Sequence, residues 1–320
     1  MNQKTKPKIK IIFIGTSGFG TIVLKGIIEN NHKPVLVITE PDKPVGRKHI
    51  ITSPAVKILA QKHNIPTLQP EILENSKSEI LNIKPDLVVV AAYGQILSKE
   101  TLEIPKYGCL NVHPSLLPKY RGPSPIQHAI LNGDKETGVS IMLLDKEMDH
   151  GPLLVNSKLQ ITDGINYPKL HDELAKIGTK LLVDIIPKWI NGEIKAMPQD
   201  DDSAIYTKIL QKENGKIDWK KSAQELERQI RAFYPWPGSF TKIDEDGKIL
   251  KIWKAKIQIQ DETCPRGPSG KTFMATNEEI AVQTGKDFFI IEELQLEGKN
   301  RMKAAEFLKG YPKFIGTILK

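Results

Sequence analysis

The chain of 320 residues is too long for one ordinary hydrophobic core, and its length favours two domains. Its 39% hydrophobic and 26% charged residues are typical of a globular protein, and no apolar run reaches the roughly 18 residues that a membrane span needs. The formal net charge of +8 permits a polyanionic partner such as a nucleic acid without requiring one. Cys109 and Cys264 stand too far apart for a zinc site or a disulfide framework, so we expect a cytoplasmic protein.

Buried strands and helices alternate over the first part of the sequence. Residues 9–15 form an apolar run of strand length, and a glycine-rich turn then leads into a helical pattern. Ser53 and Pro54 open a second helix, as a cap residue and a first-turn proline do. Further apolar strands are expected at residues 34–39, 86–91, 108–113 and 140–144. Strands that are apolar throughout predict a parallel sheet covered on both faces, so residues 1–190 are expected to form a doubly wound, Rossmann-like α/β domain.

The pattern changes after this domain. A polar stretch at residues 191–212 is the expected linker. Beyond it, Leu226, Ile230 and Phe233 recur at helical spacing and predict one helix. Short alternating segments follow, separated by turn signals, at residues 239–243, 248–259, 279–284 and 287–296. These segments predict a small antiparallel β-barrel domain of OB-like type over residues 213–320.

The first glycine-rich turn raises the question of a dinucleotide. Gly15, Gly18 and Gly20 follow the first strand, and Glu40 ends the second strand, where a nicotinamide-dependent enzyme places its ribose-binding acid. However, the glycines have the spacing G-x-x-G-x-G rather than G-x-G-x-x-G. A tight turn between strand and helix explains them without a dinucleotide.

The strongest candidate for chemistry begins at Asn111 and runs to Pro118. Asn111 and His113 are two residues apart on an expected strand, so their side chains lie on one side of it. Polar groups at the carboxyl end of a central parallel strand lie where open α/β sheets bind ligands. An amide donor and an imidazole there can stabilise an oxyanion and manage its proton. The simpler interpretation is that both residues only anchor the turn before two prolines.

Asp149 is the candidate carboxylate partner of His113. It follows another expected strand, in a loop that continues as His150, Gly151 and Pro152. A carboxylate beside an imidazole fixes the orientation of the ring and favours its charged form. By itself, Asp149 is better explained as a solvated loop acid than as a catalytic residue, and His150 is interpreted as a loop residue without a role.

These segments together resemble the signature of the folate-dependent formyltransferases. The resemblance rests on Asn111 to Pro118, on Glu136-Thr137-Gly138-Val139, and on Asp149-His150-Gly151-Pro152. It implies that Asn111, His113 and Asp149 are catalytic. It also implies 10-formyltetrahydrofolate as the formyl donor, with no metal and no nicotinamide. The residues that it implies for folate binding are Ala92, Tyr93, Gly94, Gln95, Ile96, Leu97, Ser115, Leu116, Leu117 and Pro118.

Within this superfamily the chain is most similar to the methionyl-tRNA formyltransferases. Residues 41–48, 118–127, 218–238 and 300–310 each resemble segments of those enzymes. The implied reaction moves a formyl group onto the α-amino group of the methionine on initiator tRNA. Two alternatives stay open: an amino-sugar formyltransferase with the same donor, and a tRNA-binding protein with an inactive domain. Gly18 stands where the family usually has an acid, which leaves the role of the first loop open.

Basic residues in two regions are candidates for contact with tRNA. The loop after the second strand contributes Lys43, Arg47 and Lys48, and an arginine there can fork onto phosphate or onto a base edge. In the second domain the candidates are Lys248, Lys251, Lys254 and Lys256. A solvated strand face is the alternative interpretation of this second group. We expect the protein to act as a monomer, with initiator methionyl-tRNA as its partner.

Overall fold

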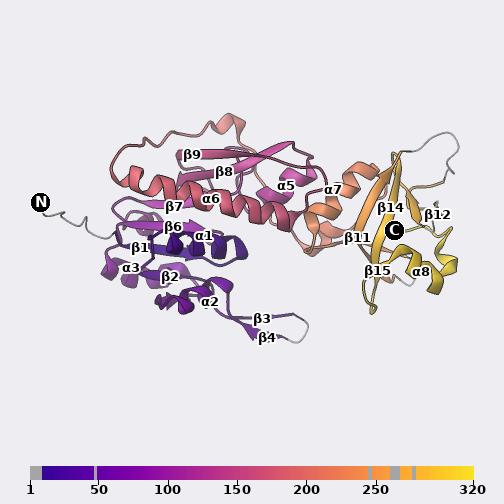
Figure 1. Cartoon of the computed structure of the whole chain (residues 1–320), viewed down its shortest axis with the longest axis horizontal. Helices are drawn as coiled ribbons and strands as arrows, with labels where there is room; N and C mark the ends of the chain where they lie inside the picture. The colour runs from indigo at the N-terminus through magenta and orange to yellow at the C-terminus, as the bar shows by residue number, and fades with distance from the viewer. Residues whose placement is uncertain (1–8, 47–48, 244–246, 260–266, 276–278) are drawn as a thin grey trace, which may run out of the picture. The chain divides into compact units, whose positions relative to one another are not determined.

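The computed structural model describes residues 9–46, 49–243, 247–259, 267–275 and 279–320 (Figure 1). Two compact units are present. The first contains the chain up to Pro125 together with Glu136–Gln160 and His171–Lys208. The second contains Ile126–Lys135, Ile161–Leu170 and Ile209–Lys320. Two short segments from the middle of the chain therefore belong to the second unit, and the boundaries expected at residues 190 and 213 stay predictions.

The first unit is built on a seven-stranded sheet with the order β5-β2-β1-β6-β7-β8-β9 (Figure 1). The first five strands in that order are parallel to their neighbours. Every residue of β1, β6 and β7 is buried, as expected for strands covered on both faces. The strand bounds are β1 Ile11–Gly15, β2 Leu36–Ile38, β5 Thr67–Leu68, β6 Leu87–Ala91, β7 Cys109–His113, β8 Glu136–Leu143 and β9 Leu153–Gln160.

Helices cover both faces of this sheet, which confirms the doubly wound arrangement. On one face, α1 and α6 pack so closely that a Cβ added to Gly26 would lie 1.9 Å from Thr179 Cγ2. On the other face, Leu73 and Ile80 join the core formed by β2, β1 and β6. The bounds in this part of the chain are α1 Gly18–Glu29, α2 Ala55–Lys62, η1 Leu73–Ser76, α3 Lys77–Ile83, α4 Lys99–Leu102, α5 Pro125–Leu131, α6 Tyr167–Ile190 and η2 Asp201–Ser203.

Two features of the first unit differ from the sequence prediction. Strand β8 runs antiparallel to β7, and β9 runs antiparallel to β8, so the sheet is mixed rather than wholly parallel. The loop between β8 and β9 is too short to hold the crossover that a parallel pair needs. In addition, the segment after β2 contains the hairpin of β3 (Lys43–Val45) and β4 (Ile50–Thr52), where a loop without strands was expected.

The second unit contains an antiparallel sheet with the order β10-β11-β14-β13-β12, and β15 pairs with β14. Helix α7 packs Leu226 and Ile230 into the core of this unit. Its first turn is held by a capping box, in which Ser222 Oγ accepts from the Glu225 amide and Glu225 accepts from the Ser222 amide. The bounds are η3 Lys212–Gly215, α7 Ala223–Phe233, β10 Ser239–Lys242, β11 Ile249–Gln258, β12 Thr272–Met274, β13 Ile280–Gln283, β14 Phe288–Leu296, β15 Met302–Lys303, α8 Ala304–Gly310 and η5 Pro312–Phe314.

The expected antiparallel domain is thus confirmed, but the expected closed barrel is not. In the part of the chain that the structure describes, β10 and β12 form the two ends of the strand order and do not pair with each other. The alternating sequence pattern predicts strands and their faces, and it does not contain the long-range pairing that would close a barrel.

Candidate active site

Asn111 and His113 lie at the carboxyl end of β7, beside β6 and β8. In the register of the sheet, Asn111 stands next to Val90 on one side and next to Met142 on the other. Both side chains are buried, with 9% of Asn111 and 4% of His113 exposed. Buried polar groups at this edge must find partners in the protein or in a ligand.

The loop between β8 and β9 brings Asp149 to these two residues. Asp149 Oδ2 lies 3.5 Å from His113 Nδ1, and Oδ1 accepts from Asn111 Nδ2 at 3.3 Å. The backbone amide of Gly122 donates to Oδ2 at 2.8 Å, and 14% of the Asp149 side chain is exposed. The fold therefore brings together the three residues that the sequence singled out, although their catalytic role stays a prediction. We refer to Asn111, His113 and Asp149 as the trio.

The hydrogen bonds of His113 define where a proton can reside. Its Nε2 lies 2.9 Å from the carbonyl oxygen of Tyr120. Since a carbonyl oxygen only accepts, Nε2 carries a ring proton. In the neutral ring Nδ1 then has no proton and faces the Asp149 carboxylate. These two groups attract each other only when a proton is bound to one of them. The geometry therefore places His113 Nδ1, which can accept a proton, 3.5 Å from Asp149 Oδ2.

The residues expected to bind folate at 92–97 leave β6, next to β7 on the same edge of the sheet. Tyr93 and Leu97 are anchored in the hydrophobic core, and the amide of Gln95 is hydrogen-bonded to the backbone of Glu71 and Leu73. Ala92, Gly94 and Ile96 are exposed. No hydrogen bond from the backbone amides of residues 93–97 occurs within the described parts of the chain. The loop is therefore fixed by its side chains and presents its backbone outward.

The buried hydroxyl of Tyr93 is a further open group in this region. It has no hydrogen-bond partner among the described residues. Burial raises the pKa of Tyr93 to about 12, and the negative charge of Glu40 contributes to the rise, so the hydroxyl is a neutral donor. The hydroxyl is enclosed by protein atoms, so Tyr93 anchors the loop through packing.

The second group expected to bind folate forms the turn after β7. Ser115 is buried, its hydroxyl donates to the Lys119 carbonyl at 2.6 Å, and its own carbonyl accepts from Ser140 Oγ at 2.8 Å. Leu117 is buried, and its amide donates to the same Ser140 oxygen at 3.1 Å. Leu116 and Pro118 are half-buried. The turn thus uses Ser115 and Leu117 for its own structure, which leaves Leu116 and Pro118 the more accessible surfaces.

Two groups near the trio were not recognised as important in the sequence. Arg121 has only 1% of its side chain exposed and contacts Gln199, Asp201 and Tyr206. His150, interpreted as a loop residue, bridges Asp145 at 2.6 Å and Asp201 at 3.3 Å. The hydrogen bond to Asp145 raises the pKa of His150. Apart from the contact between His150 and Asp145, these contacts join segments far apart in the sequence, so local spacing could not reveal them.

Three of the seven basic residues expected to contact tRNA are paired with acids in the described part of the chain. Lys43 Nζ lies 2.6 Å from Glu40 Oε2, Lys254 lies 3.3 Å from Glu292, and Lys256 lies 2.6 Å from Glu279. Lys251 covers the ring of Trp253, and Lys248 is exposed. Arg47 and Lys48 lie outside the described residues, between β3 and β4.

Asp42 holds the base of this β3–β4 hairpin. Its carboxylate accepts from Gln69 at 2.7 Å, from Lys57 at 2.8 Å and from Ser53 at 3.0 Å. The hydrogen bonds of Gln69 first, and then of Lys57, lower the pKa of Asp42 to about 2. The hairpin therefore projects from a fixed base.

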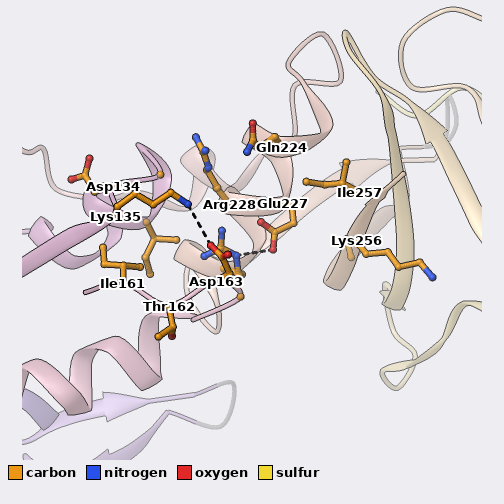
Figure 2. A pocket seen from close by; sticks show the side chains of 15 residues that line it. Asp134, Lys135, Ile161, Thr162, Asp163, Gln224, Glu227, Arg228, Lys256 and Ile257 are labelled. Atoms are coloured by element: carbon orange, nitrogen blue, oxygen red, sulfur yellow. Dashed lines mark hydrogen bonds and ion pairs between the residues drawn. The ribbon is translucent and has the colours of Figure 1, made fainter. Parts of the chain in front are cut away.

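A hollow of about 470 Å³ lies in the second unit (Figure 2). It is lined by residues 133–135 and 161–164, by α7 and by β11. Its charges are largely paired, because Lys135 contacts Asp163 at 3.4 Å and Arg231 contacts Glu227 at 2.6 Å. Figure 2 shows the Lys256 ammonium pointing away from these pairs. No member of the trio lines this hollow, and we assign it no role.

Membrane-spanning helices and metal clusters are both absent from the described residues. None of the helices found there combines the length and apolar character needed to cross a membrane. In the same part of the chain, no group of three or more His, Cys, Asp or Glu side chains is arranged to hold a metal ion.

Comparisons with known proteins identify the family. Residues 8–186 match the formyl transferase family model, and residues 209–312 match the model of the formyl transferase C-terminal domain. A methionyl-tRNA formyltransferase of Bacillus velezensis is 42% identical over 314 residues, which cover 97% of this chain and 97% of the relative. The enzyme of the same name from Bacillus subtilis is 41% identical over 314 residues, again 97% of each chain.

Solved structures share the fold at lower identity. An N-formyltransferase of Helicobacter canadensis, solved with folinic acid and dTDP-3-aminofucose, has a TM-score of 0.64 at 22% identity, over 88% of this chain and 98% of that one. HypX from Aquifex aeolicus has a TM-score of 0.65 at 16% identity, and the match covers 97% of this chain and 50% of HypX. These likenesses show the fold alone. The full-length relatives decide the classification: the chain belongs to the methionyl-tRNA formyltransferase family.

Proposed function

We propose that this protein transfers the formyl group of 10-formyltetrahydrofolate to the α-amino group of the methionine carried by initiator tRNA. The observation that carries the proposal is the trio at the end of β7, where an amide, an imidazole and a carboxylate converge, with Asp149 within 3.5 Å of both partners. The family of the chain supports the same reaction. Because the trio is complete within one chain, no second subunit has to contribute to it, and we propose a monomeric enzyme with a cytoplasmic location.

The loop at residues 92–97 is the proposed site for the folate ring. Its backbone amides, which have no partner among the described residues, offer hydrogen-bonding groups to a flat heterocycle. Positive φ angles at Ala92 (50°) and Gly94 (90°) turn the backbone at these exposed positions. Leu116 and Pro118 are the proposed apolar contacts from the neighbouring turn.

The trio can carry out both proton transfers of an acyl transfer. When bound, the folate supplies the formyl carbon, which forms a bond to the attacking amine nitrogen and loses its bond to the folate nitrogen. Asn111 Nδ2 donates to the formyl oxygen as negative charge develops on it. The His113–Asp149 pair takes one proton from the attacking amine and delivers one to the departing nitrogen, so no net charge remains. The amine must arrive unprotonated, because an ammonium group has no lone pair.

A direct test uses the two competing acceptors. Purified protein is supplied with 10-formyltetrahydrofolate and either methionyl initiator tRNA or a nucleotide amino sugar, and formyl transfer is followed by acid gel electrophoresis and by mass spectrometry. The proposal predicts formylation of the charged tRNA and none of the sugar. Formylation of the sugar alone would assign the chain to the other class of acceptor, and no transfer to either would support a binding protein.

The tRNA surface is proposed to include Lys43, Arg47 and Lys48 and the four lysines at and beside β11: Lys248, Lys251, Lys254 and Lys256. Exposed ion pairs such as Lys256–Glu279 contribute only about 0–1 kcal/mol, so a phosphate can replace the carboxylate at little cost. For every phosphate that a variant no longer neutralises, the dependence of log Kd on log salt should flatten by roughly 0.7–0.9.

Changing the four lysines to Gln tests this surface. We expect weaker tRNA binding and a flatter salt dependence in filter-binding titrations. A control variant with Lys25, Lys99 and Lys158 changed to Gln removes exposed lysines that also form ion pairs, on the first unit. If the control flattens the salt dependence as much, the effect comes from net charge and the proposed surface is wrong.

A further inference from the structure

The loop between β8 and β9 holds Asp149 in a backbone conformation that needs support. Asp149 has a φ of +49°, in the left-handed region that non-glycine residues seldom adopt. Its neighbour Met148 has 48% of its side chain exposed, so packing does not fix this part of the loop. Other contacts must therefore hold the carboxylate in register with Asn111 and His113.

Gln199 supplies these contacts. Its Nε2 donates to the Asp149 carbonyl at 2.8 Å and to the Gly151 carbonyl at 2.8 Å, so it spans the turn of the loop. Its Oε1 accepts from Arg121 Nε at 3.1 Å and from Arg121 Nη2 at 3.0 Å. Carbonyl oxygens only accept and a guanidinium only donates, which fixes the orientation of the amide. Both hydrogens and both lone pairs of the Gln199 amide are thus in use.

Arg121 holds the same loop by two routes. Its guanidinium donates to Gln199, to Asp201 at 2.7 Å and to the Tyr206 hydroxyl at 2.9 Å. The next residue, Gly122, donates its backbone amide to Asp149 Oδ2 at 2.8 Å. Burial of a guanidinium is costly unless its donors are satisfied, and here all three nitrogens have partners. These hydrogen bonds offset the cost of burying the charge, and they depend on the planar set of donors of an arginine guanidinium.

The backbone around Arg121 is held by residues 205–207, which belong to the same unit. The Arg121 amide donates to the Ile205 carbonyl at 2.8 Å, and the Thr207 amide donates to the Arg121 carbonyl at 2.8 Å. Gly122 has a φ of +102°, and a Cβ there would lie 2.9 Å from the Thr207 carbonyl. Residues of the segment that the sequence predicts as a linker therefore form part of the structure that supports the candidate active site.

We infer that Arg121 and Gln199 are positioning residues for formyl transfer, which act by fixing the Asp149 carboxylate against His113 and Asn111. The inference rests on the proposed function for its kinetic consequences and on the contacts above for its geometry. Displacement of a catalytic group by about 1 Å can reduce turnover by on the order of 10²-fold.

The test is Gln199→Glu. A carboxylate still accepts from Arg121, so the buried guanidinium keeps its partner, but it cannot donate to the carbonyls of Asp149 and Gly151. We expect kcat to fall by roughly 10–100-fold while KM for both substrates changes less than about twofold. In an Asp149→Ala background Gln199→Glu should lower kcat little further, because the carboxylate that Gln199 positions is absent.

Gln229→Glu is a matched control in the second unit. Gln229 is buried, and its Nε2, like that of Gln199, donates to two backbone carbonyls, those of Gly215 and Lys216. We expect Gln229→Glu to lower Tm and to leave kcat unchanged. A Gln199→Glu variant that folds with normal kcat would overturn the inference. So would an equal loss of kcat in the Asp149→Ala background, because Gln199 would then act only through stability.

An NMR measurement keeps this inference separate from the proposed function. The imidazole carbon resonance of His113, assigned by its disappearance in His113→Ala, reports its contact with Asp149 at a fixed pH. We expect Gln199→Glu to move this resonance toward its position in Asp149→Ala. An unmoved resonance would overturn the positioning role. If the wild-type protein failed to formylate methionyl-tRNA, the proposed function would fall while this measurement would still decide the geometry.

Discussion

Replacing Asp149 with Asn keeps the shape of the side chain and removes its charge and one of its acceptors. In the wild-type protein Oδ1 accepts from Asn111, while Oδ2 accepts from Gly122 and faces His113. An amide has one acceptor oxygen, so Asn cannot satisfy Asn111 and Gly122 together. It also carries no negative charge that could stabilise a protonated His113 ring.

The structure sets the scale of the effect. A hydrogen bond to a charged group contributes about 1.5–3 kcal/mol, and the change removes the charge from the contacts with both Gly122 and His113. Two such contributions total about 3–6 kcal/mol. If they act in the transition state, turnover falls by roughly 10²–10⁴-fold, at about 1.4 kcal/mol for each factor of ten.

Single-turnover formylation of methionyl initiator tRNA, with enzyme in excess, measures this effect on the chemical step. Asp149→Ala and Asn111→Ala should each reduce the rate by a factor in the same range. The double variant Asn111→Ala, Asp149→Asn should reduce it by less than the product of the two single factors, because the trio acts as a unit. A folded Asp149→Asn protein that kept turnover within about threefold of wild type would refute the assignment.

Four other results are expected. Gly18→Asp should raise Tm by the equivalent of about 0.5–1.5 kcal/mol, because a Cβ at this position would lie 3.5 Å from the His171 ring and an acid is favourable at a helix N-terminus. Gly26→Ala should lower Tm by the equivalent of about 1–3 kcal/mol, because the added Cβ would collide with α6. The pKa of His150 is raised, so its protonated form stabilises the folded protein at pH values below its ordinary pKa of about 6.5, and this contribution is lost as the pH rises through the raised pKa. The difference in Tm between wild type and His150→Gln should therefore shrink from about pH 6 to about pH 8. Arg47→Ala should narrow the advantage in kcat/KM of initiator tRNA over an elongator tRNA carrying methionine, and Arg47→Lys should recover little of that advantage. Full recovery with Lys would show that the loop acts through charge and not through geometry. If neither change had an effect, the loop would not take part in tRNA discrimination.

The parts of the fold that the sequence predicts are those specified by local pattern. The apolar runs of β1, β6 and β7 predict strands buried on both faces, and each of them is. The pair Asn111 and His113 could be placed on one side of a strand because strand side chains alternate. Strand β9 was not predicted, since its residues are half-buried or exposed and its composition is mixed. Its direction depends on a short loop rather than on any property of the strand.

The support of the site could not be predicted in the same way. Gln199 and Arg121 are 78 residues apart, and neither has a neighbour in sequence that signals the contact. Its position after a strand made Asp149 a candidate partner of His113, and only the resemblance to a family favoured that role, because a loop acid in isolation is more often solvated. The contacts of His150 were missed for the corresponding reason: its partner Asp201 comes from a segment that composition marks as a linker.

In the proposed mechanism His113, coupled to Asp149, carries the proton during formyl transfer to methionyl-tRNA. The measurement that tests this role most directly is the single-turnover rate of His113→Ala with saturating 10-formyltetrahydrofolate, together with tRNA binding by the same protein. We predict a rate lower by roughly 10²–10⁴-fold with tRNA affinity unchanged. A rate close to wild type in the folded variant would contradict the mechanism.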